Sequence, residues 1–150
     1  MSQEIKWKIK PFEALSLHEL YSILELRSLV FVVEQNCVYQ DIDNKDQKAI
    51  HLLGEIEGKL VAYARLFDAG IYFENTSIGR GIVHPDARSQ KLGHQLMQKA
   101  IEQIKIQFDK EQITISAQLY LQKFYESHGF VTTSEMYLGD DIPHIEMKKE

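Results

Sequence analysis

The sequence predicts an α/β fold in which helices flank a mixed β-sheet. Alternating apolar and polar residues indicate strands near the N-terminus, whereas two longer stretches carry apolar residues at helical spacing. Shorter strand-like and helical segments follow, so the expected order is β-α-β-β-β-α-β-α-β-β. The chain has 150 residues and 44% apolar composition, which is typical of one domain with a buried core. We therefore expect residues 1–150 to form a single α/β domain.

The first third of the chain contains a predicted strand, a helix and a loop. Ile5, Trp7 and Ile9 alternate with lysines, as in a strand with one buried face. Ser16 and Glu19 have the spacing of a capping box, and apolar residues at helical spacing follow them. The polar, irregular stretch 34–48 is then typical of a long loop, and loops of this length often carry function.

A β-hairpin is predicted in the middle of the chain. The strand-like segments Ile50–Ile56 and Lys59–Phe67 are separated by Glu57 and Gly58, a two-residue connection in which the glycine can adopt positive φ. The next strand, Thr76–Val83, contains two glycines. Glycines inside a strand mark a bulge or the close approach of another group, so a ligand is expected there.

The second half of the chain is predicted to contain two more helices and three more strands. Apolar residues at helical spacing from Leu92 to Phe108 indicate a second long helix that packs on the sheet. The remaining elements are a strand at 112–116, a helix at 118–128 that stops at Gly129, and strands at 130–137 and 142–147.

Composition excludes several classes of protein. A net charge of −5 and a pI near 5.7 argue against a nucleic-acid binder, which would present concentrated Lys and Arg. Cys37 is the only cysteine, so neither an internal disulfide nor a thiolate metal cluster can form. No apolar run approaches about 18 residues and the N-terminus is unlike a signal peptide. A cytoplasmic protein without a membrane partner is expected.

The segment Val83–Gly93 carries the most information about chemistry. It joins the glycine-bearing strand to the second long helix, and a helix N-terminus binds phosphate through free N–H groups and the helix dipole. Arg88, Lys91 and His94 add polar or positive groups to this end of an acidic chain. An ordinary surface helix start would fit the same spacing. Neither a Walker loop nor a dinucleotide fingerprint is present.

Several motifs resemble one known family. They are Val83-x-Pro85-x-x-Arg88-x-x-Lys91-Leu92-Gly93, Phe124-Tyr125-Glu126-Ser127-His128-Gly129-Phe130, the block from Arg27 to Asp43, the residues Ala117-Gln118, Leu121-Gln122 and Phe124-Tyr125, and Ile142-Pro143-His144-Ile145. Together they are similar to the Gcn5-related N-acetyltransferase (GNAT) superfamily and, within it, to the ElaA-like branch. One departure is Lys91, which stands where the superfamily usually has the first glycine of its pyrophosphate loop, and a non-glycine residue there is costly if φ is positive.

This resemblance implies a GNAT-like, mostly antiparallel sheet with a splayed central strand at the site of the cofactor, acetyl-CoA. The implied reaction transfers an acetyl or other acyl group to a primary amine by direct attack. A backbone N–H near the end of the splayed strand would stabilise the oxyanion. The cofactor-binding residues that follow are Ile82, Val83, Arg88, Ser89, Lys91, Leu92, Gly93, His94 and Gln118.

The resemblance also assigns residues to the reaction itself. Tyr125 is expected to be the general acid that protonates the leaving thiolate. The general base is expected among Glu34, Asp41, Asp43, His51 and His144, with Glu34 first because it ends the helix that would face the acceptor. The acceptor is expected to contact Arg27, Phe31, Asp41, Asp43 and His144. The alternative for Asp41 and Asp43 is to order the loop, with Arg27 and Arg65 as ion-pair partners. No metal is expected, because the acidic run from Asp41 lacks the Gly and Glu of an EF-hand.

Two other functions remain open at this point. The arrangement of Arg27, Phe31, Asp41 and Asp43 is also similar to the N-terminal part of acyl-homoserine lactone synthases. That family carries a tryptophan in the loop after the position of Phe31, whereas the only tryptophan here is Trp7. A non-catalytic module that binds acyl-CoA is the second alternative. The acceptor is expected to be a small amine or a protein amine, and an exposed strand edge leaves room for a homodimer.

Overall fold

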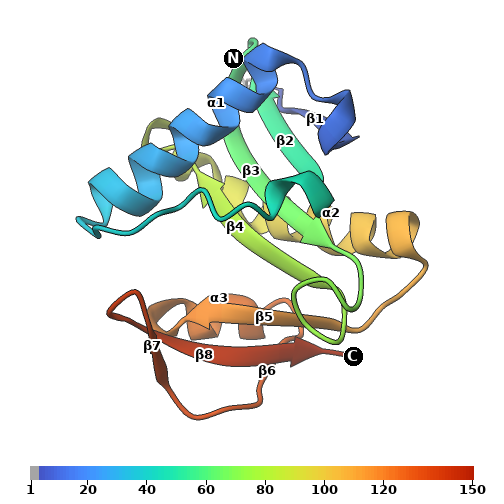
Figure 1. The fold of residues 1–150 in the computed structure, drawn as a ribbon, viewed down its shortest axis with the longest axis vertical. Coiled ribbons are helices and arrows are strands. Elements are labelled where there is room, and N and C mark those ends of the chain that lie inside the picture. Colours follow the sequence, from blue (N-terminus) through green and yellow to red (C-terminus); the bar gives the residue numbers. More distant parts are fainter. Residues whose placement is uncertain (1–3) are drawn as a thin grey trace.

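A computed structural model describes residues 4–150, with the side chains of residues 89 and 90 left out of the description. Its strands form two antiparallel sheets, shown in Figure 1. The first sheet has the order β1-β2-β3-β4, and the second has the order β5-β8-β6 with β7 also paired to β8. The strands are β1 (Lys6–Pro11), β2 (Ile50–Ile56), β3 (Lys59–Phe67), β4 (Ser77–Val83), β5 (Ile113–Gln118), β6 (Val131–Thr132), β7 (Tyr137–Gly139) and β8 (Ile142–Lys149).

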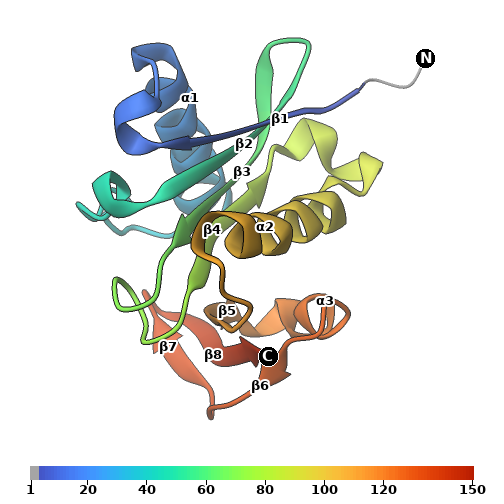
Figure 2. The ribbon, with the colours of Figure 1, turned by 90° about the vertical axis from the view of Figure 1, so that its right-hand side faces the viewer.

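Two long helices cover opposite faces of the first sheet, as Figure 2 shows. Helix α1 (Leu17–Arg27) packs through Ile23 on the face that carries Tyr63 of β3. Helix α2 (Leu92–Phe108) packs on the face that carries Ala62 and Ala64 of the same strand. Successive residues of a strand point to opposite faces, so β3 is buried on both sides and forms the centre of the core. No described helix is long and apolar enough to cross a membrane.

The two sheets meet at one point and then diverge. The Thr114 N–H donates to the carbonyl of Thr76 at 2.8 Å, and the Thr76 hydroxyl donates to the carbonyl of Gln112 at 2.6 Å. Beyond this parallel bridge β4 pairs only with β3, and β5 pairs only with β8, among the described strands. The predicted α/β fold with a splayed central strand is therefore confirmed, and a gap opens between β4 and β5.

Local sequence signals located several elements correctly. The capping box at Ser16 and Glu19 forms, because each side chain accepts a hydrogen bond from the other residue's backbone N–H. The hairpin strands have the predicted bounds, and both turn residues, Glu57 and Gly58, adopt positive φ. Helix α1 ends at Arg27, and a π-helix at Ser28–Glu34 continues it without a break.

The predictions for the C-terminal third were partly wrong. A 3₁₀ turn (Leu119–Leu121) and the short helix α3 (Gln122–Glu126) replace the expected helix over 118–128. The expected strand over 130–137 is interrupted between β6 and β7. There the Ser134 hydroxyl accepts the N–H of Glu146 at 2.9 Å, so a side chain takes the place of a backbone partner.

A closed ring of ion pairs orders the long loop before β2. We call it the Arg–Asp ring, and its members alternate in charge: Arg27, Asp41, Arg80, Asp43, Arg65, Asp46 and back to Arg27, with N–O distances of 2.8, 2.8, 3.5, 2.6, 3.0 and 2.7 Å. The three aspartates come from the loop, whereas the arginines come from α1, β3 and β4. The ring thus ties the loop to helix α1 and to two strands of the first sheet.

Burial makes the balance of charge in this ring essential. Arg27 and Arg65 are almost fully buried, and so is Asp46, which pairs with both of them. Burial alone would raise the pKa of Asp43, but the Arg65 guanidinium bonded to it holds that pKa well below its usual range. The pKa of Arg65 is raised, because its bonds to aspartates outweigh the opposing effect of burial. Asp43 and Arg65 therefore remain charged and neutralise each other.

Removing one ring carboxylate should destabilise the protein strongly. Asp46→Asn leaves two buried arginines without their shared counter-ion, and we expect a loss of about 3–5 kcal/mol in the free energy of unfolding. Urea denaturation measures this. Asp109→Asn, which removes an exposed carboxylate near Lys105, is the control and should cost less than about 1 kcal/mol. Equal effects of the two substitutions would contradict the structural role of the ring.

Candidate active site between two diverging strands

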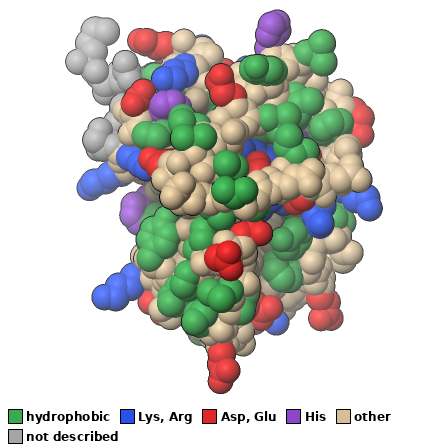
Figure 3. All heavy atoms as spheres, turned by 60° about the vertical axis from the view of Figure 1, so that its left-hand side comes forward, with side chains coloured by type: hydrophobic (Ala, Val, Ile, Leu, Met, Phe, Trp, Pro, Cys, Tyr) green, Lys and Arg blue, Asp and Glu red, His purple; other side chains and the backbone are tan. Residues whose placement is uncertain are grey.

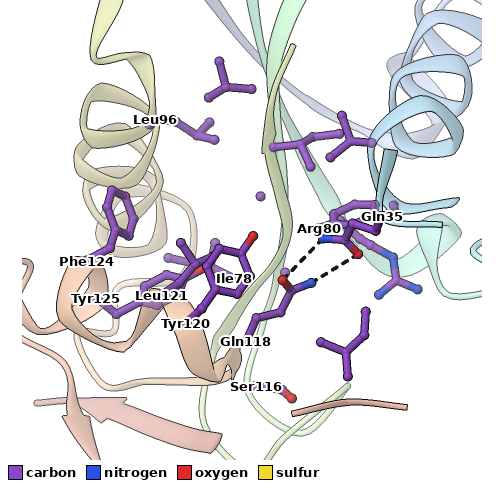
Figure 4. A pocket seen from close by; sticks show the side chains of 18 of the residues that line it. Gln35, Ile78, Arg80, Leu96, Ser116, Gln118, Tyr120, Leu121, Phe124 and Tyr125 are labelled. Atoms are coloured by element: carbon purple, nitrogen blue, oxygen red, sulfur yellow. Dashed lines mark hydrogen bonds between the residues drawn. The ribbon is translucent and has the colours of Figure 1, made fainter. Parts of the chain in front are cut away.

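A cavity of about 670 Å³ occupies the gap between β4 and β5, a size typical of ligand sites. Figure 4 shows Leu96, Phe124 and Tyr125 on the side of α2 and α3, with Gln35 and Arg80 on the opposite side. The first side also includes the start of α2. The second side is closed by β5, β8 and the segment after the π-helix. We call these sides the donor half and the acceptor half.

Strand β4 bulges where it lines the cavity. Between Gly79 and Gly81, Arg80 has φ +52°, and the pairing register with β3 shifts at this place. A left-handed conformation costs a non-glycine residue about 1–2 kcal/mol, so the surrounding contacts must hold Arg80 in place. A Cβ at Gly79 or Gly81 would meet no atom within 4 Å. The backbone of β4 is therefore open to a ligand in the cavity.

The end of β4 also presents backbone groups to the gap. The His84 N–H donates to the carbonyl of Val61 in the direction of β3 at 2.7 Å. Since backbone groups alternate along a strand, the N–H and carbonyl of Val83 point the other way, and that carbonyl accepts a bond from Arg88 Nε at 3.2 Å. Ile82 and Val83 line the cavity, as expected for cofactor-binding positions.

The donor half ends at the N-terminus of α2. Lys91 is the N-cap and has φ +57°, so the position usually held by glycine does adopt the left-handed conformation here. The first turn of α2 contains no acidic residue, and Arg88, Lys91, Gly93 and His94 line the cavity. Free N–H groups of a first helical turn, the helix dipole and these side chains together suit a phosphate group.

Leu92 and Ser89 differ from the other predicted cofactor-binding residues in what the structure shows of their side chains. The side chain of Leu92 packs in a core cluster with Ile56, Val61 and Ala87, so only its backbone is available to a ligand. Contact between a cofactor and the backbone of Leu92 stays a prediction. The side chain of Ser89 lies outside the described part of the structure, and its role remains a prediction.

Glu34, the first choice for the general base, does not line the cavity. Its carboxylate forms a two-pronged ion pair with Arg88, with N–O distances of 2.8 and 2.5 Å. The bonds from Arg88 lower the pKa of Glu34, although partial burial opposes this. A carboxylate with a lowered pKa is a weaker base, so the structure argues against this assignment. The pair instead links the π-helix to the segment between β4 and α2.

The Arg–Asp ring holds three of the residues that were expected to bind the acceptor. Arg27, Asp41 and Asp43 do not line the cavity. Arg27 has no exposed surface, and Asp41 accepts bonds from Arg27 Nε and from the Tyr39 hydroxyl at 2.8 and 2.9 Å. The ion pairs agree with the alternative expectation, in which Asp41 and Asp43 order the loop through Arg27 and Arg65, and not with direct acceptor contacts.

His51 is also unsuited to act as a base. It is fully buried, and its two ring nitrogens lie 2.6 Å from the Tyr63 hydroxyl and 2.9 Å from the Asp46 carbonyl. Burial lowers its pKa, even though the Asp46 carbonyl opposes the shift. Because both nitrogens are occupied, His51 cannot accept a proton from a substrate amine.

His144 is the base candidate that lies in the cavity. It pairs with Gln118 across β5 and β8, and both residues line the acceptor half together with Phe31. The Nδ1 atom lies 2.6 Å from the carbonyl of Ile142, which can only accept a hydrogen bond. Nδ1 therefore carries the proton of the neutral ring, and Nε2 keeps a free lone pair. The ring is fixed by stacking on Tyr137 at 6.0 Å between centroids.

Tyr125 lines the donor half and is held by two aromatic neighbours. Its ring makes edge contacts with Phe124 and Phe130, at centroid distances of 5.3 and 5.9 Å. Burial raises the pKa of its phenol to about 12. The hydroxyl therefore stays protonated at neutral pH, which a general acid requires.

Sequence reasoning missed several cavity residues, among them Gln35 and Arg80. Gln35 and Gln118 exchange amide contacts of 3.3 and 3.5 Å across the gap (Figure 4), so the amide of Gln118, an expected cofactor-binding residue, already has a partner. The signal for Arg80 was a large residue between two glycines in a strand. The signal for Gln35 was absent, since only the fold brings it to Gln118.

A family model described as an acetyltransferase (GNAT) domain matches residues 19–150. The chain belongs to the GNAT acetyltransferase family. It is 43% identical to the protein ElaA of Escherichia coli over 148 residues, covering 97% of both chains. The ElaA-like branch is thereby confirmed, and membership supports acyl-CoA-dependent N-acyl transfer in general terms.

Solved structures of similar proteins agree with this GNAT assignment. The crystal structure of Escherichia coli ElaA has a TM-score of 0.91 at 42% identity and covers 98% of this chain and 100% of that one. An acyl-CoA N-acyltransferase from Pseudomonas aeruginosa has the same TM-score at 41% identity, covering 97% and 99%. The synthase LasI matches at a TM-score of 0.80 with 12% identity, which shows the fold alone.

The ion pair between Glu34 and Arg88 should compete with a bound cofactor. Glu34→Gln frees Arg88, so we expect CoA to bind about 2–5-fold more tightly, as for the loss of a partly exposed ion pair. Isothermal titration calorimetry with CoA measures this. Glu25→Gln makes the same charge change on an exposed position of α1 and should not alter CoA affinity. Weaker binding by Glu34→Gln would contradict the competition.

Proposed function

We propose that this GNAT protein transfers an acetyl group from acetyl-CoA to a primary amine by direct attack. The observation that carries the proposal is one continuous cavity that joins a phosphate-suited helix N-terminus to the free Nε2 of His144. A donor bound along β4 would have its thioester between these two ends. Membership of the family supports acyl transfer in general. The shape and the charged groups of the cavity are the grounds for proposing an acyl-CoA donor and an amine acceptor.

The residues of the donor half fit an acyl-CoA. Arg88, Lys91 and the first turn of α2 would hold the pyrophosphate, for which positive charge and free N–H groups are needed. The open backbone at Gly79 and Gly81 leaves room for the pantetheine arm. The Val83 N–H would donate to the thioester carbonyl oxygen. A donor aimed at a developing oxyanion is typically worth about 3 kcal/mol of transition-state stabilisation.

Proton transfer is assigned to two residues on opposite sides of the gap. His144 Nε2 would take the proton of the attacking amine, because a protonated amine has no lone pair for attack. Tyr125 would give its phenolic proton to the leaving thiolate. The new C–N bond forms as the C–S bond breaks, which leaves an N-acyl product and the free thiol of CoA.

Replacing the proposed acid should slow turnover without weakening donor binding. Tyr125→Phe keeps the ring contacts with Phe124 and Phe130 but removes the proton, so kcat should fall about 10²–10⁴-fold. Steady-state kinetics and CoA titration measure the two quantities. Tyr21→Phe, on an exposed position of α1, is the matched control. Unchanged turnover in Tyr125→Phe would refute the assignment.

His144 can be tested by removal and chemical rescue. His144→Ala should lower kcat about 10²–10⁴-fold, and added imidazole should restore part of the rate if the ring acts as a base. His18→Ala, on the exposed side of α1, serves as the control. A rate within twofold of the unmodified protein would place the base elsewhere.

The proposed reaction as a whole is tested by thiol release. The protein is incubated with acetyl-CoA and a panel of amines, and free CoA and the acylated product are measured together. Stoichiometric formation of both supports the proposal. Tight CoA binding without product from any amine would instead support a non-catalytic acyl-CoA-binding module.

A further inference from the structure

The acceptor half contains a fixed positive group that the proposed chemistry leaves unused. Arg80 lines the cavity and keeps about one fifth of its side chain exposed. Its Nε lies 2.8 Å from Asp41 Oδ1 at a poor hydrogen-bond angle, and its Nη2 donates to the Asp41 carbonyl at 3.1 Å. Among the side chains and backbone groups that the structure describes, none is a hydrogen-bond partner of Nη1. Arg80 therefore retains donor capacity for a ligand.

The placement of Arg80 is built into the fold. Its left-handed backbone between two glycines turns the side chain toward the acceptor half. The rings of Phe31 and Tyr39 lie 5.8 and 5.9 Å from the guanidinium, and both residues line the cavity. Its distance to Asp43 is 3.5 Å, the longest in the Arg–Asp ring. The guanidinium is thus oriented without being fully engaged.

The β7–β8 turn contributes a negatively charged group to the same cavity. Asp140 lies in this turn, is exposed and lines the cavity. The Cys37 thiol donates to the carbonyl of Asp140 at 3.4 Å, which brings the turn against the segment that precedes Tyr39. His144 follows the turn, and a Cβ at Gly139 would meet its ring at 2.8 Å. A carboxylate and the proposed base are therefore close in the chain and share this cavity.

We propose that the acceptor is a free amino acid with an apolar side chain. Its α-carboxylate would accept hydrogen bonds from Arg80 Nη1, a charge-assisted contact. Its ammonium group would be attracted by Asp140 and would lose its proton to His144 before attack on the thioester. Phe31 and Tyr39 would contact the apolar side chain. The products are an N-acyl amino acid and free CoA.

This proposal rests on the proposed acyl transfer and sharpens it. The acidic loop first suggested a purely cationic acceptor, but its aspartates are bound to arginines in the ring. A polyamine or a protein lysine has no carboxylate next to its amine, and such an acceptor would leave Arg80 Nη1 without a partner. An amine with an adjacent carboxylate would offer a negative group to Arg80 and a positive group to Asp140.

Matched acceptor pairs test the proposal in the unmodified protein. Leucine and leucinamide differ only in the carboxylate, and so do tyrosine and tyramine. We expect kcat/KM to be about 10–100-fold higher for each amino acid, the range for one charge-assisted hydrogen bond. Equal or faster turnover of leucinamide, or acylation confined to polyamines or to lysine-containing peptides, would overturn it.

Substitution of Arg80 adds a second, independent readout. Arg80→Gln should remove the preference for leucine over leucinamide, whereas Arg80→Lys, which keeps the charge, should retain part of it. Thermal melting and CoA titration show whether each variant is folded. Retention of the full preference in Arg80→Gln would contradict the assignment.

A binding measurement separates this proposal from the proposed reaction. Leucine and leucinamide are titrated by calorimetry into the protein saturated with CoA. If no amine is acylated, tighter binding of leucine that Arg80→Gln abolishes would still support the carboxylate site. Equal binding of the two compounds would refute the site even if some other amine is acylated.

Discussion

The Arg–Asp ring is the interaction on which the acceptor half depends. The loop before β2 is polar and offers few apolar side chains to a core, so hydrophobic burial cannot order it. Its three aspartates instead neutralise arginines from α1, β3 and β4. Because breaking a buried ion pair leaves an uncompensated charge, the ring has few alternative arrangements. The loop, Tyr39 and Arg80 are fixed together.

The divergence of β4 and β5 has a comparable importance for the donor half. A continuous sheet would satisfy the outer edge of β4 with another strand, whereas here that edge faces a cavity. The bridge at Thr76 holds the two sheets together at one end, and α2 and α3 close the cavity on one side. Backbone groups that would normally pair with a strand are thereby available to a ligand.

In the proposed reaction, the two halves would recognise their ligands by different means. The donor half would use backbone geometry, namely an open strand edge and a helix N-terminus that has Lys91 in place of glycine. The acceptor half would depend on individual side chains, above all Arg80 and His144. Family motifs therefore identify an acyl-CoA donor readily, while the acceptor has to be inferred from the charges and contacts in this particular cavity.

The sequence by itself determined the elements whose causes are local. The capping box at Ser16, the hairpin turn at Glu57 and Gly58 and the helical spacing of α2 involve neighbours within a few residues, and all three were predicted correctly. The donor-half residues followed from motifs that are also local.

Only the tertiary structure decided the roles of the polar residues. Asp41 and Glu34 are suitable as bases by residue type alone. In the folded protein, however, Arg27 forms an ion pair with Asp41, and Arg88 forms one with Glu34. The interruption between β6 and β7 likewise depends on a side chain that bonds to another strand. A carboxylate, a histidine or an arginine acquires its function from the charges around it, and folding brings those charges together.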